Sequence, residues 1–370
     1  MTGDFDPSDH RWSASADRAA WSVRLCRAGF GKRDCASVFE SALGRSSSLG
    51  CPPMSAAGVQ AFVACTSRKR HLPVPGLQLR DLNGPLMQRA AEWTSRLESA
   101  RRTIAALDLY TGNSWFVARD LRDTLGNDCL LWALSAGFGL LGADDDIAPY
   151  GATLARGHAD SVVRRTDPGG ASRATRTWWG ALCDWHGPSS QTSCHRKIAS
   201  VAAKHPADLF VVCAGRSYVD AMADDLARAA SRLAVPERLI IFGSGVCPDD
   251  RLRRSWVRVH SRVRLAVGGA LNSLFVRIAR YALVERDSSP ADAFGMQAMV
   301  DQLAASVERP SDIRRDRSSD EQIADWIAGE LQSGERISKS AALRKLRRGG
   351  RACEQSRFGR LFDDVQASLR

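Results

Sequence analysis

Short, continuous apolar runs alternate along the chain with longer stretches in which apolar residues recur at helical spacing. The runs at residues 59–64, 130–135, 208–213 and 238–242 predict strands covered on both faces, because such strands present no polar side. The helical stretches between them predict right-handed crossovers and parallel pairing. We therefore expect an α/β fold with a mostly parallel central sheet flanked by helices.

The predicted helices fall in the segments that connect and follow these strands. They cover residues 86–104, 114–125, 219–233 and 274–284, and a further helix begins near residue 178. Residues 164–177 are polar and contain glycine, which predicts a surface loop.

Composition divides the chain into four parts. Residues 1–57 are rich in Ser, Gly, Ala and Arg, and we interpret them as a partly ordered N-terminal extension. The α/β domain occupies residues 58–307, and the Ser-, Arg- and Asp-rich residues 308–319 form a linker. Residues 320–370 predict a small, helical, basic C-terminal domain, with helices near 320–333, 338–348 and 354–369.

Composition also narrows the class of protein. No apolar run reaches the roughly 18 residues needed to span a bilayer, and the first residues lack the pattern of a secretory signal. We therefore expect no membrane partner and a cytoplasmic location. The ten cysteines lack short, regular spacing, which is typical of reduced thiols. The oligomeric state stays open.

The chain carries a net charge of +11, from 52 Lys and Arg against 41 Asp and Glu. This balance favours polyanionic partners. Basic residues gather in the C-terminal domain around a turn at Gly349-Gly350, an arrangement compatible with a helix-turn-helix-like DNA clamp. The alternative is a solvated basic face. The DNA-binding candidates are Arg344, Arg347, Arg348, Arg351 and Arg357.

Residues suited to binding or catalysis lie at the ends of the predicted strands or directly after them. Cys65 and Lys69 come after the first strand, and Ser135 and Gly137 lie at the end of the second. Ligands of open α/β sheets bind beyond the carboxyl ends of the strands. We therefore expect the site at this edge of the sheet.

Short motifs in these loops resemble the YaaA-like proteins, a bacterial family that includes DNA-binding members. The resemblance covers most of residues 58–358 and departs from the family in the N-terminal extension, the long loop after Tyr150 and the basic tail. The matching pieces are Cys65-Thr66-Ser67-Arg68-Lys69, Asp108-Leu109-Tyr110-Thr111-Gly112, Leu134-Ser135-Ala136-Gly137-Phe138-Gly139, Asp146, Pro149-Tyr150, Gly215, Tyr218, Gly268-Gly269, Leu271-Asn272, Leu343-Arg344 and Arg351-Ala352-Cys353-Glu354-Gln355-Ser356-Arg357-Phe358.

The resemblance implies a fold similar to the uracil-DNA-glycosylase superfamily and work on modified bases in DNA. We expect a DNA N-glycosylase of anti-phage defence that excises a modified base, such as glucosylated hydroxymethylcytosine of phage DNA, and leaves an abasic site. The expected partner is double-stranded DNA with modified bases. The alternatives are an enzyme that modifies 7-deazaguanine bases in DNA and a non-catalytic DNA-binding stress protein.

An N-glycosylase must stabilise a cationic sugar and direct water onto it, and one carboxylate does both. Asp108 and Asp146 are the catalytic candidates. The alternative for Asp108 is a cap on the following helix, and the alternative for Asp146 is a solvated acidic turn.

A flipped base needs an aromatic surface, polar edges and a phosphate contact. Lys69 is a candidate to bind the phosphate of the flipped nucleotide. The alternative is that Arg68-Lys69-Arg70 is simply a charged loop, as such runs usually are. Tyr150 follows a proline in a loop, where packing alone gives little reason for a tyrosine. The substrate-binding candidates are Cys65, Thr66, Lys69, Tyr110, Gly112, Ser114, Ser135, Gly137, Tyr150 and Tyr218.

No cofactor or metal is expected. Cys183, His186, Cys194 and His195 supply four potential zinc ligands, but adjacent Cys194 and His195 are poorly spaced for one ion. The Gly243-Ser244-Gly245 segment lacks the spacing of a P-loop or a dinucleotide fingerprint.

Overall fold

The computed structural model of this 370-residue protein describes residues 58–101, 103–187, 195–286, 288–308, 316–333 and 337–369. The predicted N-terminal extension and most of the predicted linker lie outside these ranges. The described residues contain two separate apolar cores, one in the α/β unit and one in a C-terminal helical unit. No helix in the described ranges is long and apolar enough to cross a membrane.

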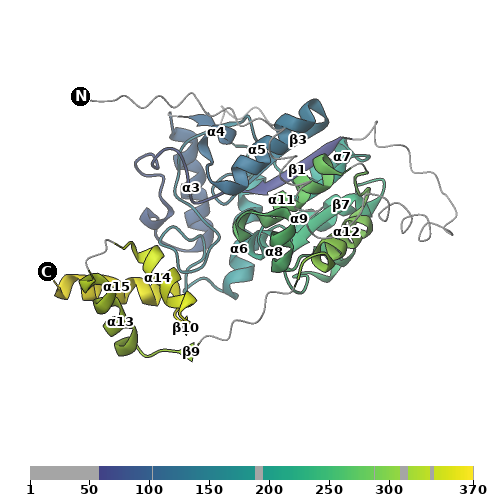
Figure 1. The fold of residues 1–370 in the computed structure, drawn as a ribbon. Helices are drawn as coiled ribbons and strands as arrows, with labels where there is room; N and C mark the ends of the chain where they lie inside the picture. Colours follow the sequence, from purple (N-terminus) through teal and green to yellow (C-terminus); the bar gives the residue numbers. More distant parts are fainter. Residues whose placement is uncertain are drawn as a thin grey trace, which may run out of the picture. The chain divides into compact units, whose positions relative to one another are not determined.

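A six-stranded sheet forms the centre of the α/β unit, with helices around it (Figure 1). All neighbouring strands pair in parallel except β3 and β4, which pair antiparallel. The fold is therefore α/β with a mostly parallel central sheet, as predicted. The order is β4 (Gly139–Gly142), β3 (Cys129–Ser135), β1 (Val59–Ala64), β6 (Leu209–Cys213), β7 (Leu239–Gly243) and β8 (Trp256–Arg258).

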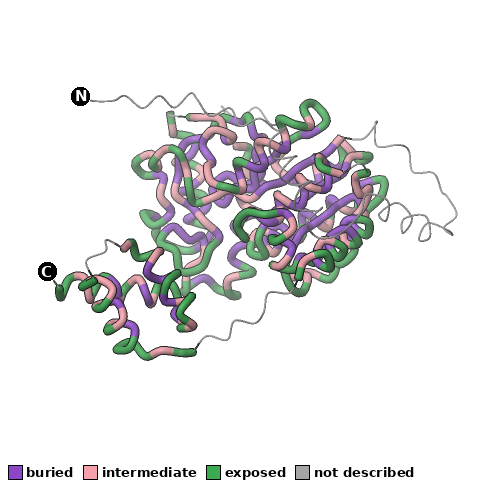
Figure 2. The backbone as a smooth tube through the Cα atoms, in the orientation of Figure 1, coloured by how far each residue is buried: buried purple, intermediate pink, exposed green. Residues whose placement is uncertain are grey.

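The order of the strands reverses beside β1. The chain passes from β1 to β3 on one side, and then crosses back to β6 on the other side. Right-handed crossovers in opposite directions place their helices on opposite faces of the sheet. The crevice between the carboxyl ends of β1 and β6 is therefore the switch point, where open α/β sheets bind ligands. Buried residues run along the strands of the sheet, and most exposed residues lie on the outer helices and loops (Figure 2).

The helices differ from prediction where glycine or a short strand interrupts the pattern. Helix α6 begins at Gly170, so the predicted loop is wrong beyond residue 169. Helix α3 ends at Ser99, because Ile104–Ala105 forms β2 and pairs with β5 (Asp146–Ile147). The helices of this unit are α3 (Leu86–Ser99), α4 (Ala106–Leu109), α5 (Asn113–Leu125), α6 (Gly170–Asp184), α7 (Ile198–Lys204), α8 (Arg216–Ala221), α9 (Ala223–Ala230), α10 (Arg264–Val267), α11 (Leu274–Arg280) and α12 (Ala293–Ala305).

The C-terminal unit contains three helices, as predicted: α13 (Asp320–Gln332), α14 (Lys339–Arg348) and α15 (Gln355–Ser368). Their apolar faces meet in a small core that includes Ile323, Leu346 and Phe358. A two-stranded parallel sheet pairs β9 (Asp316–Arg317), which precedes α13, with β10 (Arg351–Ala352), which lies between α14 and α15.

Candidate functional site

Buried hydroxyl and thiol groups meet at the carboxyl ends of β1 and β3. The Tyr150 hydroxyl is the centre: it lies 2.7 Å from the Ser135 hydroxyl and 2.9 Å from the Tyr110 hydroxyl. It also donates to the Cys65 sulfur at 3.6 Å. The Cys65 sulfur in turn lies 3.1 Å from the Tyr218 hydroxyl, across the switch point between β1 and β6. We call these five residues the hydroxyl network.

The three tyrosines of the hydroxyl network are neutral. Burial raises the pKa values of Tyr110, Tyr150 and Tyr218 well above the ordinary value of 10.0. All three tyrosines therefore keep their protons at neutral pH. Tyr150 lies in a loop but is only 1% exposed, because its ring packs edge-on against Trp93 and Phe138. The expectation that packing gives little reason for this tyrosine is wrong.

Gly137 lets the turn after β3 close over Tyr150. A Cβ atom at this position would stand 2.5 Å from Cε2 of Tyr150, closer than real Cβ contacts allow. The Gly137 and Phe138 amides donate to the Ser135 hydroxyl, and the Gly137 carbonyl accepts from the Trp93 indole at 2.7 Å. The turn and the hydroxyl network are thus built as one packed unit.

Lys69 places its ammonium group over the tyrosine rings. Its Nζ lies 4.2 Å from the Tyr150 ring centre and 5.9 Å from that of Tyr110, within the range of cation–π attraction. It donates to the Thr66 carbonyl at 3.2 Å. Three other described lysines instead pair with carboxylates: Lys197 with Asp184, Lys339 with Asp363 and Lys345 with Glu330.

Burial lowers the pKa of Lys69 from its ordinary value of 10.5. The nearby Cys65 and Asp160 act in the opposite direction. Asp160 is buried and accepts a bidentate ion pair from Arg80, which lowers the pKa of this carboxyl group. Sequence reasoning missed Asp160, since a single aspartate in a Gly-His-Ala-Asp loop has no motif around it.

A cavity of about 440 Å³ lies against the segment that directly follows Lys69. The amide of Arg70 donates to the Leu109 carbonyl at 2.9 Å, and the amide of Val74 donates to the Pro149 carbonyl at 2.8 Å. These bonds anchor the cavity wall to the chain segments that carry Tyr110 and Tyr150. The lining residues are Arg70, His71, Leu72, Pro73, Val74 and Pro75.

The two catalytic candidates lie outside this network. Asp108 is about half-exposed in α4 and accepts from Arg119 at 3.2 Å. It does not cap α5, whose N-cap is Gly112. Asp146 is exposed in β5, opposite Ala105 of β2. Within the described residues, neither carboxylate bonds to the hydroxyl network.

Three further binding candidates have structural contacts in the neighbouring loops. The Thr66 hydroxyl donates to the carbonyl oxygens of Arg68 and Thr111. Gly112 has a φ of +99°, which L side chains rarely adopt, and it joins α4 to α5. The Ser114 hydroxyl donates to the Asn272 carbonyl at 2.7 Å. These residues shape the rim beside Lys69 rather than the network itself.

No metal centre is found in the described ranges, where no group of three or more His, Cys, Asp or Glu side chains gathers. Cys194 lies outside these ranges, so the potential zinc set is not described in full. Burial raises the pKa of the Cys183 thiol to about 12, which opposes formation of the thiolate that zinc requires.

The basic candidates of the C-terminal unit divide into two kinds. Arg347 donates to the Cys353 carbonyl at 2.8 Å, and Arg357 binds Asp320 and the Ser318 carbonyl. Arg344, Arg348 and Arg351 are exposed and form no ion pair within the described ranges. The first two arginines hold the unit together, whereas the other three face solvent.

Comparison with known proteins adds no relative to this description. No family model, no curated protein and no solved structure matches the chain. The function is therefore inferred from the chemistry of the site and from the resemblance of its motifs.

Proposed function

We propose that this protein is a DNA N-glycosylase that excises a modified base and leaves an abasic site. The YaaA-like resemblance supplies the substrate class, with glucosylated hydroxymethylcytosine of phage DNA as the leading example, and a uracil-DNA-glycosylase-like fold. The main support is the contact between Cys65 and Tyr218, which spans the switch point. A built polar site at this point is typical of a ligand-binding α/β protein.

The surroundings of Lys69 suit a nucleotide that has been turned out of the duplex. Lys69 directly precedes the segment that lines the 440 Å³ cavity, and in this proposal its ammonium group holds a phosphate beside the flipped base. The hydroxyl network beneath it has its polar groups satisfied, so it holds the ends of β1 and β3 in fixed positions. In this proposal the cavity accepts the base and Lys69 the backbone.

Asp108 is the proposed stabiliser of the cationic sugar, and in that role its carboxylate must turn away from Arg119. We expect Asp108→Asn to abolish excision and to spare DNA binding, because it removes the charge and keeps the size. Arg119→Met is the matched control: it breaks the same ion pair and should leave excision in place. Equal effects of both variants would make the pair structural, and Asp146→Asn would then be the decisive variant.

The class of reaction is tested on DNA from phages of different base chemistry. Alkali-labile sites and a released base on one modified DNA would support the glycosylase. A mass change of the DNA without base release would instead indicate modification of a 7-deazaguanine base. Binding without any product would indicate a non-catalytic DNA-binding protein.

The C-terminal unit is the proposed DNA clamp. Replacing Arg344, Arg348 and Arg351 with Ala should weaken binding to all sequences alike and flatten the salt dependence, by about one unit of slope for each lost phosphate contact. Arg357→Ala is the contrasting variant, since it breaks an internal contact and should lower the stability of the unit. Titration of a labelled duplex at several salt concentrations measures the affinity and its salt dependence. Equal slopes for the wild type and the triple variant would show that these arginines do not contact phosphates and would remove the clamp from the proposal.

A further inference from the structure

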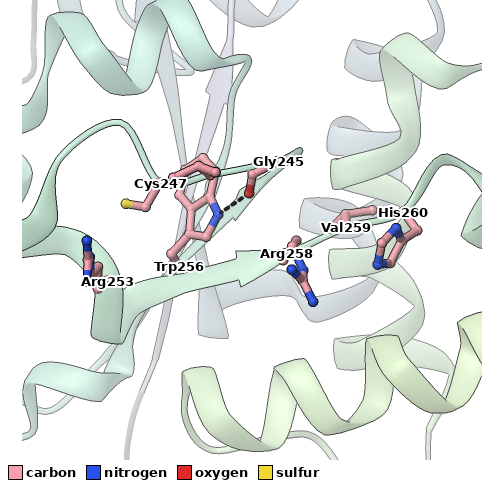
Figure 3. Close-up of a pocket in the computed structure, with 8 residues that line it drawn as sticks. Gly245, Cys247, Arg253, Trp256, Arg258, Val259 and His260 are labelled. Carbon is pink, nitrogen blue, oxygen red and sulfur yellow. Dashed lines mark hydrogen bonds between the residues drawn. The ribbon is translucent and has the colours of Figure 1, made fainter.

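A larger cavity of about 570 Å³ lies at the other end of the sheet, where the loop after β7 meets β8 (Figure 3). No motif in the sequence marks this place. The cavity combines one large aromatic ring, two arginines, an imidazole and a thiol. Its lining residues are Gly245, Val246, Cys247, Arg253, Trp256, Arg258, Val259 and His260.

The Trp256 indole is held in one orientation. A Cβ atom on Gly243 would collide with the ring, so the indole lies directly against the backbone of β7. The indole N–H donates to the Gly245 carbonyl at 3.3 Å, as Figure 3 shows. The ring remains half-buried and lines the cavity, which makes it a preformed surface for stacking.

The charge of the cavity lining is positive, because it includes Arg253 and Arg258 and no acidic residue, and His260 adds a polar imidazole. Arg253 pairs with Asp250. The side chains of Arg258 and His260 are exposed and form no ion pair within the described ranges. The backbone of Arg258 is fixed on both sides by the Gln297 amide of α12. The Arg258 guanidinium, with the His260 imidazole near it in the lining and a fixed indole beside them, suits an anion that carries a planar ring.

We propose that this cavity binds a nucleoside phosphate, with the base on the Trp256 indole and the phosphate at Arg258 and His260. Arg216 at the start of α8 donates to the Val246 carbonyl at 2.8 Å, and the same helix carries Tyr218 of the hydroxyl network. Helix α8 therefore links the loop that lines the cavity to the hydroxyl network. The nucleotide belongs to the DNA strand near the excised base, an assignment that rests on the proposed function.

The test uses a labelled ten-residue oligothymidylate and, separately, free thymidine monophosphate. Trp256→Ala and Arg258→Gln should each weaken oligonucleotide binding by about tenfold, the order expected for loss of a stacked base or a phosphate contact. Trp256→Phe should keep most of the affinity, because an aromatic face remains. Arg254→Gln is the control, since this neighbouring arginine pairs with Glu237 and does not line the cavity.

The outcomes separate this site from the proposed reaction. Wild-type affinity in Trp256→Ala and Arg258→Gln, or an equal loss in Arg254→Gln, would overturn the nucleotide site. If Trp256→Ala fails to fold, as judged by its unfolding transition, Arg258→Gln decides. Displacement of the oligonucleotide by the free monophosphate would identify a free nucleotide as the ligand, and resistance would identify a DNA strand. Absence of base release from every DNA would overturn only the glycosylase.

Discussion

The two ends of the carboxyl edge of the sheet are built differently. Around β1 and β3, buried and part-buried hydroxyl and thiol groups are bonded to one another, with Lys69 above them. Around β7 and β8, an indole, two arginines and an imidazole line an open cavity. The first arrangement keeps its atoms fixed, and the second leaves charged groups available to a ligand. One sheet thus carries a rigid region and a binding region, separated by β6.

Removing the centre of the hydroxyl network should have the largest effect. We expect Tyr150→Ala to lower the free energy of unfolding by about 3–5 kcal/mol, because it leaves a cavity in a packed core. Tyr150→Phe should cost about 1–3 kcal/mol, since the Ser135 and Tyr110 hydroxyls lose their shared partner. Trp256→Phe at the open end should cost less than about 1 kcal/mol. Urea unfolding of the three variants tests this order, and a larger loss in Trp256→Phe would contradict the contrast.

Adding a methyl group beneath Tyr150 tests how tightly the network is packed. Gly137→Ala should lower the free energy of unfolding by about 1–3 kcal/mol, because the new Cβ overlaps the tyrosine ring. Gly180→Ala is the control: no atom lies within 4 Å of its Cβ position in α6, and a helical alanine should stabilise by about 0.5–1 kcal/mol. Thermal unfolding should therefore shift in opposite directions, and an unshifted Gly137→Ala would mean that the turn relaxes.

The smallest effect concerns the charge on Lys69. Its pKa is lowered in the folded protein, so between that pKa and 10.5 the unfolded chain binds more protons. Stability then rises with pH in this window, and the penalty of the buried charge is full below it. Lys69→Met removes this dependence.

The measurement is the difference between the unfolding free energies of the wild type and Lys69→Met, followed from pH 7 to pH 10. We expect the unfolding free energy of the wild type to rise relative to that of Lys69→Met as the pH rises. Other groups cancel in this difference. Parallel curves would show that solvent reaches the amine freely.

The central strands were predictable, and the strands at the edges of the sheet were not. The apolar run of β1 has the predicted bounds, because a strand buried on both faces has a continuous apolar sequence. The edge strand β8 has three residues and ends in a charged Arg258, so its pattern does not differ from that of a loop. Helix α6 begins at Gly170, within a Gly169-Gly170 pair that favours a loop in the sequence.

The sequence located the candidate site through the positions of its loops and not through its contacts. Ser135 and Tyr150 were candidates because they follow a buried strand, and the structure brings them together. The contact between Cys65 and Tyr218 joins residues 153 positions apart, and only the strand order creates it. The cavity at Trp256 was missed because the strand that carries it was missed.

The place of β1 in the sheet has a consequence for folding. This strand comes early in the described chain but lies in the middle of the sheet, where Val59 pairs with Cys129 on one side and Leu209 on the other. During synthesis, the backbone hydrogen-bonding groups along one edge of β1 stay unpaired until residues 209–213 are available. Such long-range pairing slows folding and exposes an edge on which strands of other chains can add. We expect nascent chains that end before residue 209 to aggregate or to need a chaperone.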